Sequence, residues 1–250
     1  MILEVDLGNT RIKWRLRTES GSLASGSLDQ EPLESLARQF TRQAWQPRQI
    51  WVASVRPQSA NADLADQCYR LWQLSPGFAQ TQAQTAGLVN AYRDHRQMGV
   101  DRWLALLAAH RAYTDPVLVV QAGTALTVDL LAPDGRHLGG YIGPGWQLMR
   151  RALAEQTAQV RLPVQTPSWD IDPGYSTAEA VKAALAAMTL GLIERGRAVL
   201  SGEAGKPRVI VGGGDGEGLA AVLGDAIYRP ELVLDGLAPA YEGGALLFQG

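Results

Sequence analysis

The first residues that could carry chemistry form a polar segment near the N-terminus, residues 6–13. Asp6 supplies a carboxylate, and Mg²⁺ prefers a carboxylate together with phosphate oxygens. A glycine in this position lets a phosphate approach backbone amides, and the neighbouring polar side chains can donate to it. These further positions are Gly8, Asn9, Thr10 and Lys13. A plain hairpin with a polar tip explains the same residues, so the segment alone leaves both interpretations open.

Gly123 and Thr124 form a second turn of this kind in the later half of the chain. The alignment that superposes this turn on the first places Gln121 opposite Asp6. Two matching turns favour a pair of phosphate-binding loops and indicate a duplicated lobe. A third glycine run, residues 212–216, could cover an adenine or a ribose with bare backbone, although such runs are more often plain tight turns.

A third constellation lies at residues 99–102, which precede an apolar stretch predicted to be helical over residues 103–113. Asp101 therefore sits at or near a helix N-cap, and capping alone explains many such aspartates. Beside two phosphate-binding loops, the same carboxylate can orient an acceptor hydroxyl and accept its proton, which is most of what a kinase requires. Arg102 could clamp an anionic substrate or be a solvated arginine, and Tyr92 could line the acceptor pocket.

The elements that must position these residues repeat in order along the chain. The first half reads strand, strand, strand, helix, strand, at residues 2–5, 11–17, 21–28, 33–40 and 49–55. The second half repeats this order, at residues 117–120, 125–131, 137–142, after 144, and 208–211. Such a pattern predicts an α/β fold with mixed sheets. We expect two lobes, residues 1–114 and 115–250, that face each other across a cleft.

Two further segments predict additional features of the fold, and the histidines indicate no metal site. Residues 177–200 carry apolar residues at helical spacing and predict a long buried or interface helix. Residues 163–174 contain three prolines and predict an ordered loop or a mobile flap. His95, His110 and His137 lack the spacing of a metal site, so we expect surface or capping roles for them.

Composition narrows the class of partner. The chain has 250 residues, 46% of them hydrophobic, so it can bury a substantial core. Its 23 basic and 25 acidic residues nearly cancel and are scattered, which argues against a nucleic-acid or membrane surface and favours a small-molecule partner. The single cysteine, Cys68, fits a reducing compartment, and the N-terminus predicts a strand rather than a signal peptide. No apolar run approaches the roughly 18 residues of a membrane span.

Taken together, the motifs resemble those of the type III pantothenate kinases. The motifs, in chain order, are Asp6-x-Gly-Asn-Thr with Lys13, Gly99-x-Asp101-Arg102, Gly123-Thr124-Ala125-x-Thr127-x-Asp129, and Gly139-Gly-x-Ile-x-Pro-Gly145. The match spans nearly the whole chain, and four ordered motifs are far more specific than one glycine loop.

This resemblance implies an actin-like (ASKHA) fold of two RNase H-like lobes. It also implies ATP-dependent phosphorylation of pantothenate to 4′-phosphopantothenate, the first step of coenzyme A biosynthesis, by a cytoplasmic homodimer. The implied cofactors are ATP, Mg²⁺ and a monovalent cation such as K⁺ or NH₄⁺. Asp6 would meet Mg²⁺ through the phosphates, and Asp101 would accept the proton.

The resemblance also assigns the remaining site residues. The implied ATP-binding residues are Asp6, Gly8, Asn9, Thr10, Lys13, Gly123 and Thr124. The implied pantothenate-binding residues are Tyr92, Gly99, Val100, Asp101, Arg102 and Thr177, of which Thr177 would act across a dimer interface.

One position departs from the family pattern. Members usually carry Asp at the position of Gln121, where the carboxylate is associated with the monovalent cation. Glutamine keeps a carbonyl oxygen but loses the charge. The alternatives that remain are an actin-like kinase for another small alcohol and a non-catalytic or regulatory protein of the same fold.

Overall fold

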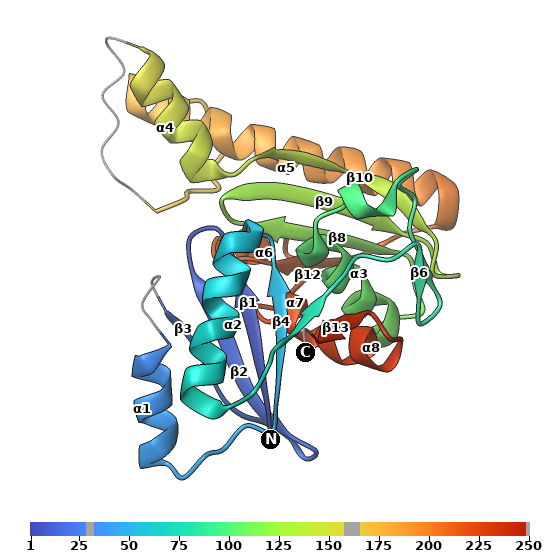
Figure 1. Ribbon diagram of the computed structural model, residues 1–250. Helices are drawn as coiled ribbons and strands as arrows, with labels where there is room; N and C mark the ends of the chain where they lie inside the picture. Colours follow the sequence, from blue (N-terminus) through green and yellow to red (C-terminus); the bar gives the residue numbers. More distant parts are fainter. Residues whose placement is uncertain (29–32, 158–165, 249–250) are drawn as a thin grey trace. The chain divides into compact units, whose positions relative to one another are not determined.

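The computed structural model describes residues 1–28, 33–157 and 166–248. The chain divides into two compact units, each containing one of the two large sheets (Figure 1). The first unit comprises Met1–Gly87, Tyr92–Ala108 and Leu232–Gly250, and the second comprises Leu88–Ala91 and Ala109–Glu231. The lobes expected from the sequence, residues 1–114 and 115–250, remain a prediction about domains. The compact units differ from them most clearly in assigning residues 232–250 to the first unit.

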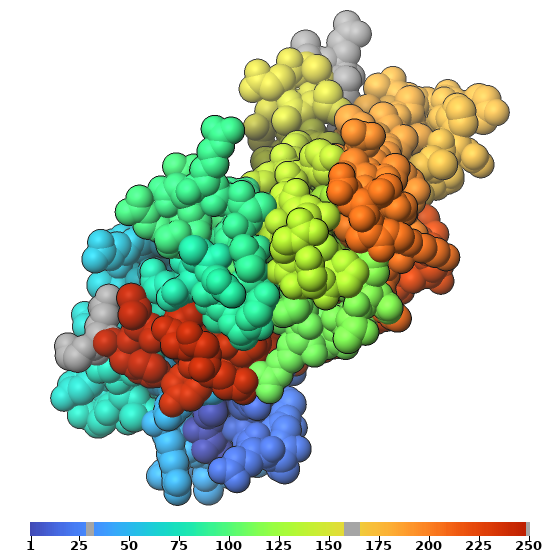
Figure 2. Space-filling view, turned by 90° about the vertical axis from the view of Figure 1, so that its right-hand side faces the viewer, coloured from blue at the N-terminus to red at the C-terminus, as the bar shows by residue number. Residues whose placement is uncertain are grey.

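The first unit is built on a six-stranded sheet in the order β13-β5-β4-β1-β2-β3. Its strands are β1 (Ile2–Leu7), β2 (Ile12–Thr18), β3 (Gly21–Leu28), β4 (Gln49–Ser54), β5 (Gly77–Ala79) and β13 (Leu246–Phe248). The helical elements of this unit are α1 (Glu34–Arg42), α2 (Gln58–Trp72), η1 (His95–Gln97), α7 (Leu232–Asp235) and α8 (Leu237–Glu242), and α3 (Val100–Ala112) begins in it. Figure 2 shows the C-terminal segment, in red, beside cyan and teal residues of the first unit.

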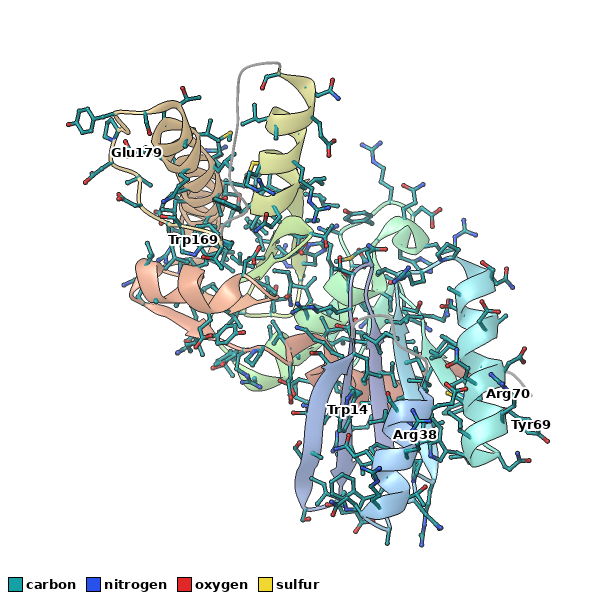
Figure 3. All side chains as sticks on the ribbon, turned by 90° about the vertical axis from the view of Figure 1, so that its left-hand side faces the viewer. Trp14, Arg38, Tyr69, Arg70, Trp169 and Glu179 are labelled. Atoms are coloured by element: carbon teal, nitrogen blue, oxygen red, sulfur yellow. The ribbon has the colours of Figure 1, made fainter. Side chains whose placement is uncertain are left out.

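The spacing of apolar residues in α1 explains how this helix packs on the sheet. Leu36 and Phe40 are one helical turn apart, and both are almost completely buried. Trp14 of β2 lies toward α1 (Figure 3), where its ring meets that of Phe40 edge to face at 5.6 Å between centroids. This packing fixes the position of β2, and therefore also the position of Lys13, the residue that precedes Trp14.

The second unit contains a five-stranded sheet in the order β10-β9-β8-β11-β12. Its strands are β8 (Val117–Ala122), β9 (Ala125–Leu131), β10 (His137–Pro144), β11 (Arg208–Gly212) and β12 (Ala226–Tyr228). Its helices are α4 (Trp146–Gln156), α5 (Thr177–Ala204) and α6 (Gly216–Leu223). The short strands β6 (Gln84–Thr85) and β7 (Leu88–Val89) form a separate two-stranded sheet.

The long helix α5 packs on the apolar face of the second sheet (Figure 1). Leu118 of β8 and Val128 of β9 are fully buried there. A Cβ at Gly196 of α5 would lie 2.9 Å from atoms of both side chains, so this glycine permits the close approach of helix and sheet. The predicted helix at residues 177–200 is therefore confirmed. Residues 166–174 form no helix or strand, and residues 163–165 of the predicted loop lie outside the described residues.

The two sheets repeat one topology, as the sequence predicts. In the first, β3, β2 and β1 are antiparallel neighbours, and β4 and β5 follow in parallel. In the second, β10, β9 and β8 are antiparallel neighbours, and β11 and β12 follow in parallel. The five strands thus have the same order and the same directions in both units. The mixed sheets and the duplication are confirmed.

A buried ion-pair network ties the C-terminal segment to the first strands. Glu4 of β1 and Arg15 of β2 are opposite each other in the sheet, and Arg15 Nε donates to Glu4 Oε2 at 2.6 Å. Arg15 Nη1 donates to Asp235 Oδ1 of α7 at 2.7 Å. Burial raises the pKa of Glu4, and the hydrogen bond from Arg15 opposes that rise. A buried arginine that lost Asp235 would keep its charge with fewer partners.

We therefore expect Asp235→Ala to lower the free energy of unfolding by about 2–3 kcal/mol. Asp134→Ala is the matched control, because its pair with Arg136 has the same 2.7 Å separation but both side chains are more than half exposed. The control should change stability by less than about 0.5 kcal/mol. Urea unfolding of both variants measures the difference, and equal losses would contradict a special role for the buried network.

Candidate functional site

The segment at residues 6–13 forms the end of β1, a tight turn and the start of β2. Asp6 and Lys13 are opposite each other in the antiparallel register, which places an ammonium beside the carboxylate. The Gly8 backbone N–H donates to the Arg11 carbonyl at 3.1 Å and closes the turn, at whose tip Asn9 and Thr10 are exposed. The hairpin predicted from the sequence is thus present, with a polar and accessible tip.

The electrostatic surroundings of Asp6 link it to Asp101. Burial raises the pKa of Asp6 to about 7, Lys13 lowers it, and the negative charge of Asp101 raises it further. The first unit therefore brings two carboxylates that are 95 positions apart in the sequence within electrostatic reach of each other. A strongly perturbed carboxylate beside a second one is typical of a functional site.

Arg56 belongs to the same turn, although the sequence analysis did not select it. Its Nε donates to the Gly8 carbonyl at 2.8 Å, and its backbone N–H donates to the Ser54 hydroxyl. The position of Arg56 just after a predicted strand could have indicated its place in the site. β4 is parallel to β1 and pairs Ser54 with Leu7, so residues that follow the two strands lie at one sheet edge.

Asp101 lies in the first turn of α3 rather than at the position before the helix. The Trp103 N–H donates to the Gly99 carbonyl at 3.1 Å, and Asp101 Oδ1 accepts the Arg102 N–H at 2.8 Å. A Cβ at Gly99 would lie 2.6 Å from Asp101 Oδ1, so the glycine leaves room for the carboxylate. The side chain of Val100 is buried, which leaves its backbone as the part that could contact a ligand.

Arg102 is buried, with 4% of its surface exposed, so the alternative of a solvated arginine is wrong. Its Nη1 donates to the Tyr92 hydroxyl at 2.7 Å. The guanidinium carbon is also 5.5 Å from the centroid of the Tyr92 ring. Two residues selected separately from the sequence are therefore in direct contact, and the segment that carries Asp101 is anchored through them.

Three glycine-rich segments of the second unit meet at residues 122–124. The Gly145 N–H donates to the Thr124 carbonyl at 3.0 Å, and the Asp215 N–H donates to the Ala122 carbonyl at 3.0 Å. A Cβ at Gly145 would overlap the Gly123 carbonyl oxygen, and one at Gly213 would overlap that of Ala122. Bare backbone is therefore required for the turns to approach each other.

A small cavity opens beside this junction. Its lining includes Gly123, Trp146, Trp169, Thr189 and Asp215. Trp169 lies beside α6 (Figure 3). Burial raises the pKa of Asp215. The sequence analysis did not select Trp146, Trp169 or Thr189, because their convergence depends on contacts between α4, α5, α6 and the intervening segment.

The remaining predicted site residues also lie in the second unit. Gln121 is the last but one residue of β8 and pairs with Thr127 of β9 and Gly212 of β11. Thr177 is the first residue of α5 and is exposed. It follows Ser176, the N-cap, whose hydroxyl accepts the Glu179 N–H at 3.3 Å.

His137 corrects a prediction. It was expected at the surface or as a cap, but it is 3% exposed and its Nε2 lies 3.1 Å from Asp129 Oδ1. Asp129 lies on β9 and His137 on the adjacent strand β10, and the contact between their side chains compensates for part of the hydration that burial removes. Isolated histidine spacing cannot reveal such a contact. Among the residues described, no cluster of three or more His, Cys, Asp or Glu side chains could hold a metal ion.

The sequence comparisons with known proteins agree on one family. The sequence model of the family described as type III pantothenate kinase matches residues 2–198. A protein from Cellvibrio japonicus named type III pantothenate kinase is 40% identical over 242 residues, covering 95% of each chain. A protein of the same name from Pseudomonas aeruginosa is 37% identical over 245 residues, covering 96% of this chain and 98% of the relative.

A solved structure of a conserved Baf family protein from Campylobacter jejuni supports the fold. It superposes with a TM-score of 0.63 at 20% identity and covers 97% of this chain and 98% of its own. At this identity the likeness concerns the fold alone. Together with the repeated sheets, it establishes the expected actin-like α/β fold. No helix in the described part of the chain has both the length and the apolar character needed to cross a membrane.

Asp6→Asn should make the ligand-free protein more stable at high pH. The raised pKa means that protonated Asp6 contributes stability below about pH 4, and that this contribution is lost as the pH rises through about 7. Asparagine removes the cost of ionisation, so we expect a gain of about 1–3 kcal/mol at pH 8 that vanishes near pH 4. Urea unfolding without nucleotide or metal measures it. Exposed Asp63→Asn is the control, and an equal gain in both variants would contradict the assignment.

Gly145→Ala should disrupt the junction of the second unit, because its new methyl group would overlap a backbone oxygen that cannot rotate away. We expect a loss of about 2 kcal/mol or more in unfolding free energy. Gly143→Ala is the matched control two residues earlier, where an added Cβ meets nothing within 4 Å. Thermal unfolding of both variants decides, and equal stability would show that the junction tolerates displacement.

Proposed function

The chain belongs to the type III pantothenate kinases, which transfer a phosphoryl group from ATP to pantothenate in coenzyme A biosynthesis, and we propose the roles of its residues in that reaction. The observation that carries the proposal is the electrostatic proximity of Asp6 and Asp101 in the first unit. Phosphoryl transfer needs a site for charged phosphates and a carboxylate that orients the acceptor, and these two residues supply the two parts.

Asp6 and its hairpin bind the phosphates of ATP in this proposal. Lys13 neutralises phosphate charge, while the exposed tip offers the Asn9 and Thr10 side chains and the backbone at Gly8. Arg56 holds that backbone through the Gly8 carbonyl. In the second unit, the Gly123 and Thr124 turn offers a further amide and hydroxyl. Few side chains are needed there, because backbone N–H groups bind phosphate oxygens directly.

Mg²⁺ fits the residues at Asp6. A magnesium ion in kinases is held by one or two carboxylates together with substrate phosphates and water. A partly buried carboxylate of raised pKa is a group that a divalent cation would favour in its ionised form. The ion would supply neutralisation of phosphate charge during transfer.

Asp101 orients the primary hydroxyl of pantothenate and accepts its proton late in the transfer. Its position in the first turn of α3 places the carboxylate beside the partial positive charge of the helix N-terminus. Arg102 and Tyr92 bind the acceptor as a unit, since one already donates to the other. Gly99 and the Val100 backbone allow the substrate to approach this turn.

The active species in this proposal is a homodimer in which Thr177 reaches the partner's substrate. The support is the exposed side of α5, which carries Ala184, Ala187, Met188 and Gly191 where a solvated helix would carry charge. Met188 is 53% exposed. Analytical ultracentrifugation tests this, and a purely monomeric mass at assay concentration would contradict it.

The monovalent cation implied by the resemblance would lack a charged ligand at Gln121. The neighbouring positions on both strands are Thr127 and Gly212, so the side chains there offer a neutral amide and a hydroxyl in place of the family's carboxylate. No step of the proposed mechanism therefore uses K⁺ or NH₄⁺.

We place the enzyme in the cytoplasm, which suits coenzyme A biosynthesis and the buried free thiol of Cys68.

Asp101→Asn should lower kcat by about 10²–10³ while leaving ATP affinity within a few fold, because the amide cannot accept the proton. Steady-state ADP release and calorimetric ATP binding measure the two quantities. The matched control is Asp94→Asn, seven residues earlier, whose carboxylate pairs with exposed Arg96. Near-normal turnover in Asp101→Asn would remove Asp101 from the proposed mechanism.

A further inference from the structure

Gln121 occupies an unusual place in the second sheet. It lies on the central strand β8, two residues before the Gly123 turn, with β9 on one side and β11 on the other. Its neighbour on β11 is Gly212, where a Cβ would lie 2.5 Å from Gln121 Oε1. The absence of a side chain at Gly212 therefore makes room for the amide group.

Two polar atoms at this place have no hydrogen-bond partner among the described residues. They are Nε2 of Gln121 and Oγ1 of Thr127, and each atom is buried. Thr127 is 7% exposed and is paired with Gln121 in the β8–β9 register. An unsatisfied buried polar group costs free energy, and native structures keep few of them. A pair at adjacent positions near a predicted phosphate-binding turn is best explained by a ligand that completes both.

The chemistry of the unpaired nitrogen selects the class of ligand. A primary amide nitrogen carries two N–H donors and cannot ligate a cation, and the oxygen of the same amide lacks the negative charge of a carboxylate. The neighbouring carboxylate, Asp129, already has His137 Nε2 within 3.1 Å. An oxygen acceptor with negative charge suits these donors, and a hydrogen bond to a charged acceptor is stronger than a neutral one.

We propose that Gln121 binds a phosphate oxygen of the nucleotide through its amide N–H, with Thr127 beside it, and that turnover of this enzyme is independent of K⁺ and NH₄⁺. The inference rests on the proposed function, since it assumes that the Gly123 turn receives the phosphates. A neutral donor then takes the place of a bound cation in holding the nucleotide. Gly212 is required for this arrangement, because a side chain there would displace the Gln121 amide.

The test uses the full chain and three proteins, namely wild type, Gln121→Met and Gln121→Glu. Methionine keeps a similar length without a donor, and glutamate keeps the shape but replaces the donor by a charge. Affinity for the Mg²⁺ complex of β,γ-imido-ATP is measured by calorimetry in choline chloride and in KCl. Thermal unfolding of each ligand-free protein and pantothenate-dependent ADP release are measured in the same two salts.

The wild type should bind the nucleotide and turn over equally in both salts. Gln121→Met should bind about 10–100-fold more weakly, as expected for the loss of a hydrogen bond to a charged group. Its ligand-free form should be at least as stable as the wild type, because an unsatisfied amide has been removed. Gln121→Glu should bind weakly in choline chloride and recover in KCl, as a carboxylate would need a cation between itself and the phosphate.

Three results would overturn the inference while leaving the kinase assignment intact. The first is a tenfold activation of the wild type by KCl. The second is an unchanged nucleotide affinity in Gln121→Met. The third is a Gln121→Met protein that binds the nucleotide as well as the wild type but is less stable than the wild type without ligand, which would show that Gln121 has a purely structural role. The absence of pantothenate-dependent ADP release in either salt, by a protein that still binds the nucleotide, would instead contradict the proposed function.

Discussion

Keeping Asp6 ionised in a partly buried position is the constraint on which the first unit depends. The carboxylate loses hydration at the end of a central strand, and the charge of Asp101 makes ionisation harder still. Lys13, opposite it in the sheet, offsets only part of that cost. A bound divalent cation would remove the remainder, so the ligand-free site is arranged to favour a positively charged ligand at Asp6.

That arrangement requires precise support from elements that are distant in the sequence. Trp14 and Phe40 fix β2, Arg56 holds the carbonyl of Gly8, and the pair of Arg102 with Tyr92 anchors the turn that carries Asp101. Each contact restrains a backbone segment rather than a ligand. Positioning of this kind accounts for much of catalysis in phosphoryl transfer, where the protein contributes little covalent chemistry.

In the second unit, backbone groups rather than charged side chains hold the turns of the predicted site together. Glycines at positions 145 and 213 let three turns approach closely enough to share hydrogen bonds at residues 122–124. The unit repeats the topology of the first, yet Gln121 stands where the first unit has Asp6. The two units thus share their strand order, while the side chain near the end of the equivalent strand is a carboxylate in the first unit and a neutral amide in the second.

Local patterns predicted much of this structure. The hairpin at residues 6–13, the helix over 177–200 and the repeated strand order follow from alternation, turn residues and helical spacing, which are short-range signals. The burial of His137, the role of Arg56 and the pairing of β13 with β5 depend on contacts between distant segments. Single-sequence periodicity does not encode those contacts. The predicted substrate residues Tyr92 and Arg102 were selected separately, and only the structure reveals that they touch.

The most direct test of the central claim is mass-spectrometric detection of the product formed by the purified chain from ATP, Mg²⁺ and pantothenate. The account predicts stoichiometric 4′-phosphopantothenate and ADP, with no ADP formed when pantothenate is omitted or replaced by glucose or acetate. ADP formation that does not depend on pantothenate, or a phosphorylated product from another acceptor at a higher rate, would contradict it.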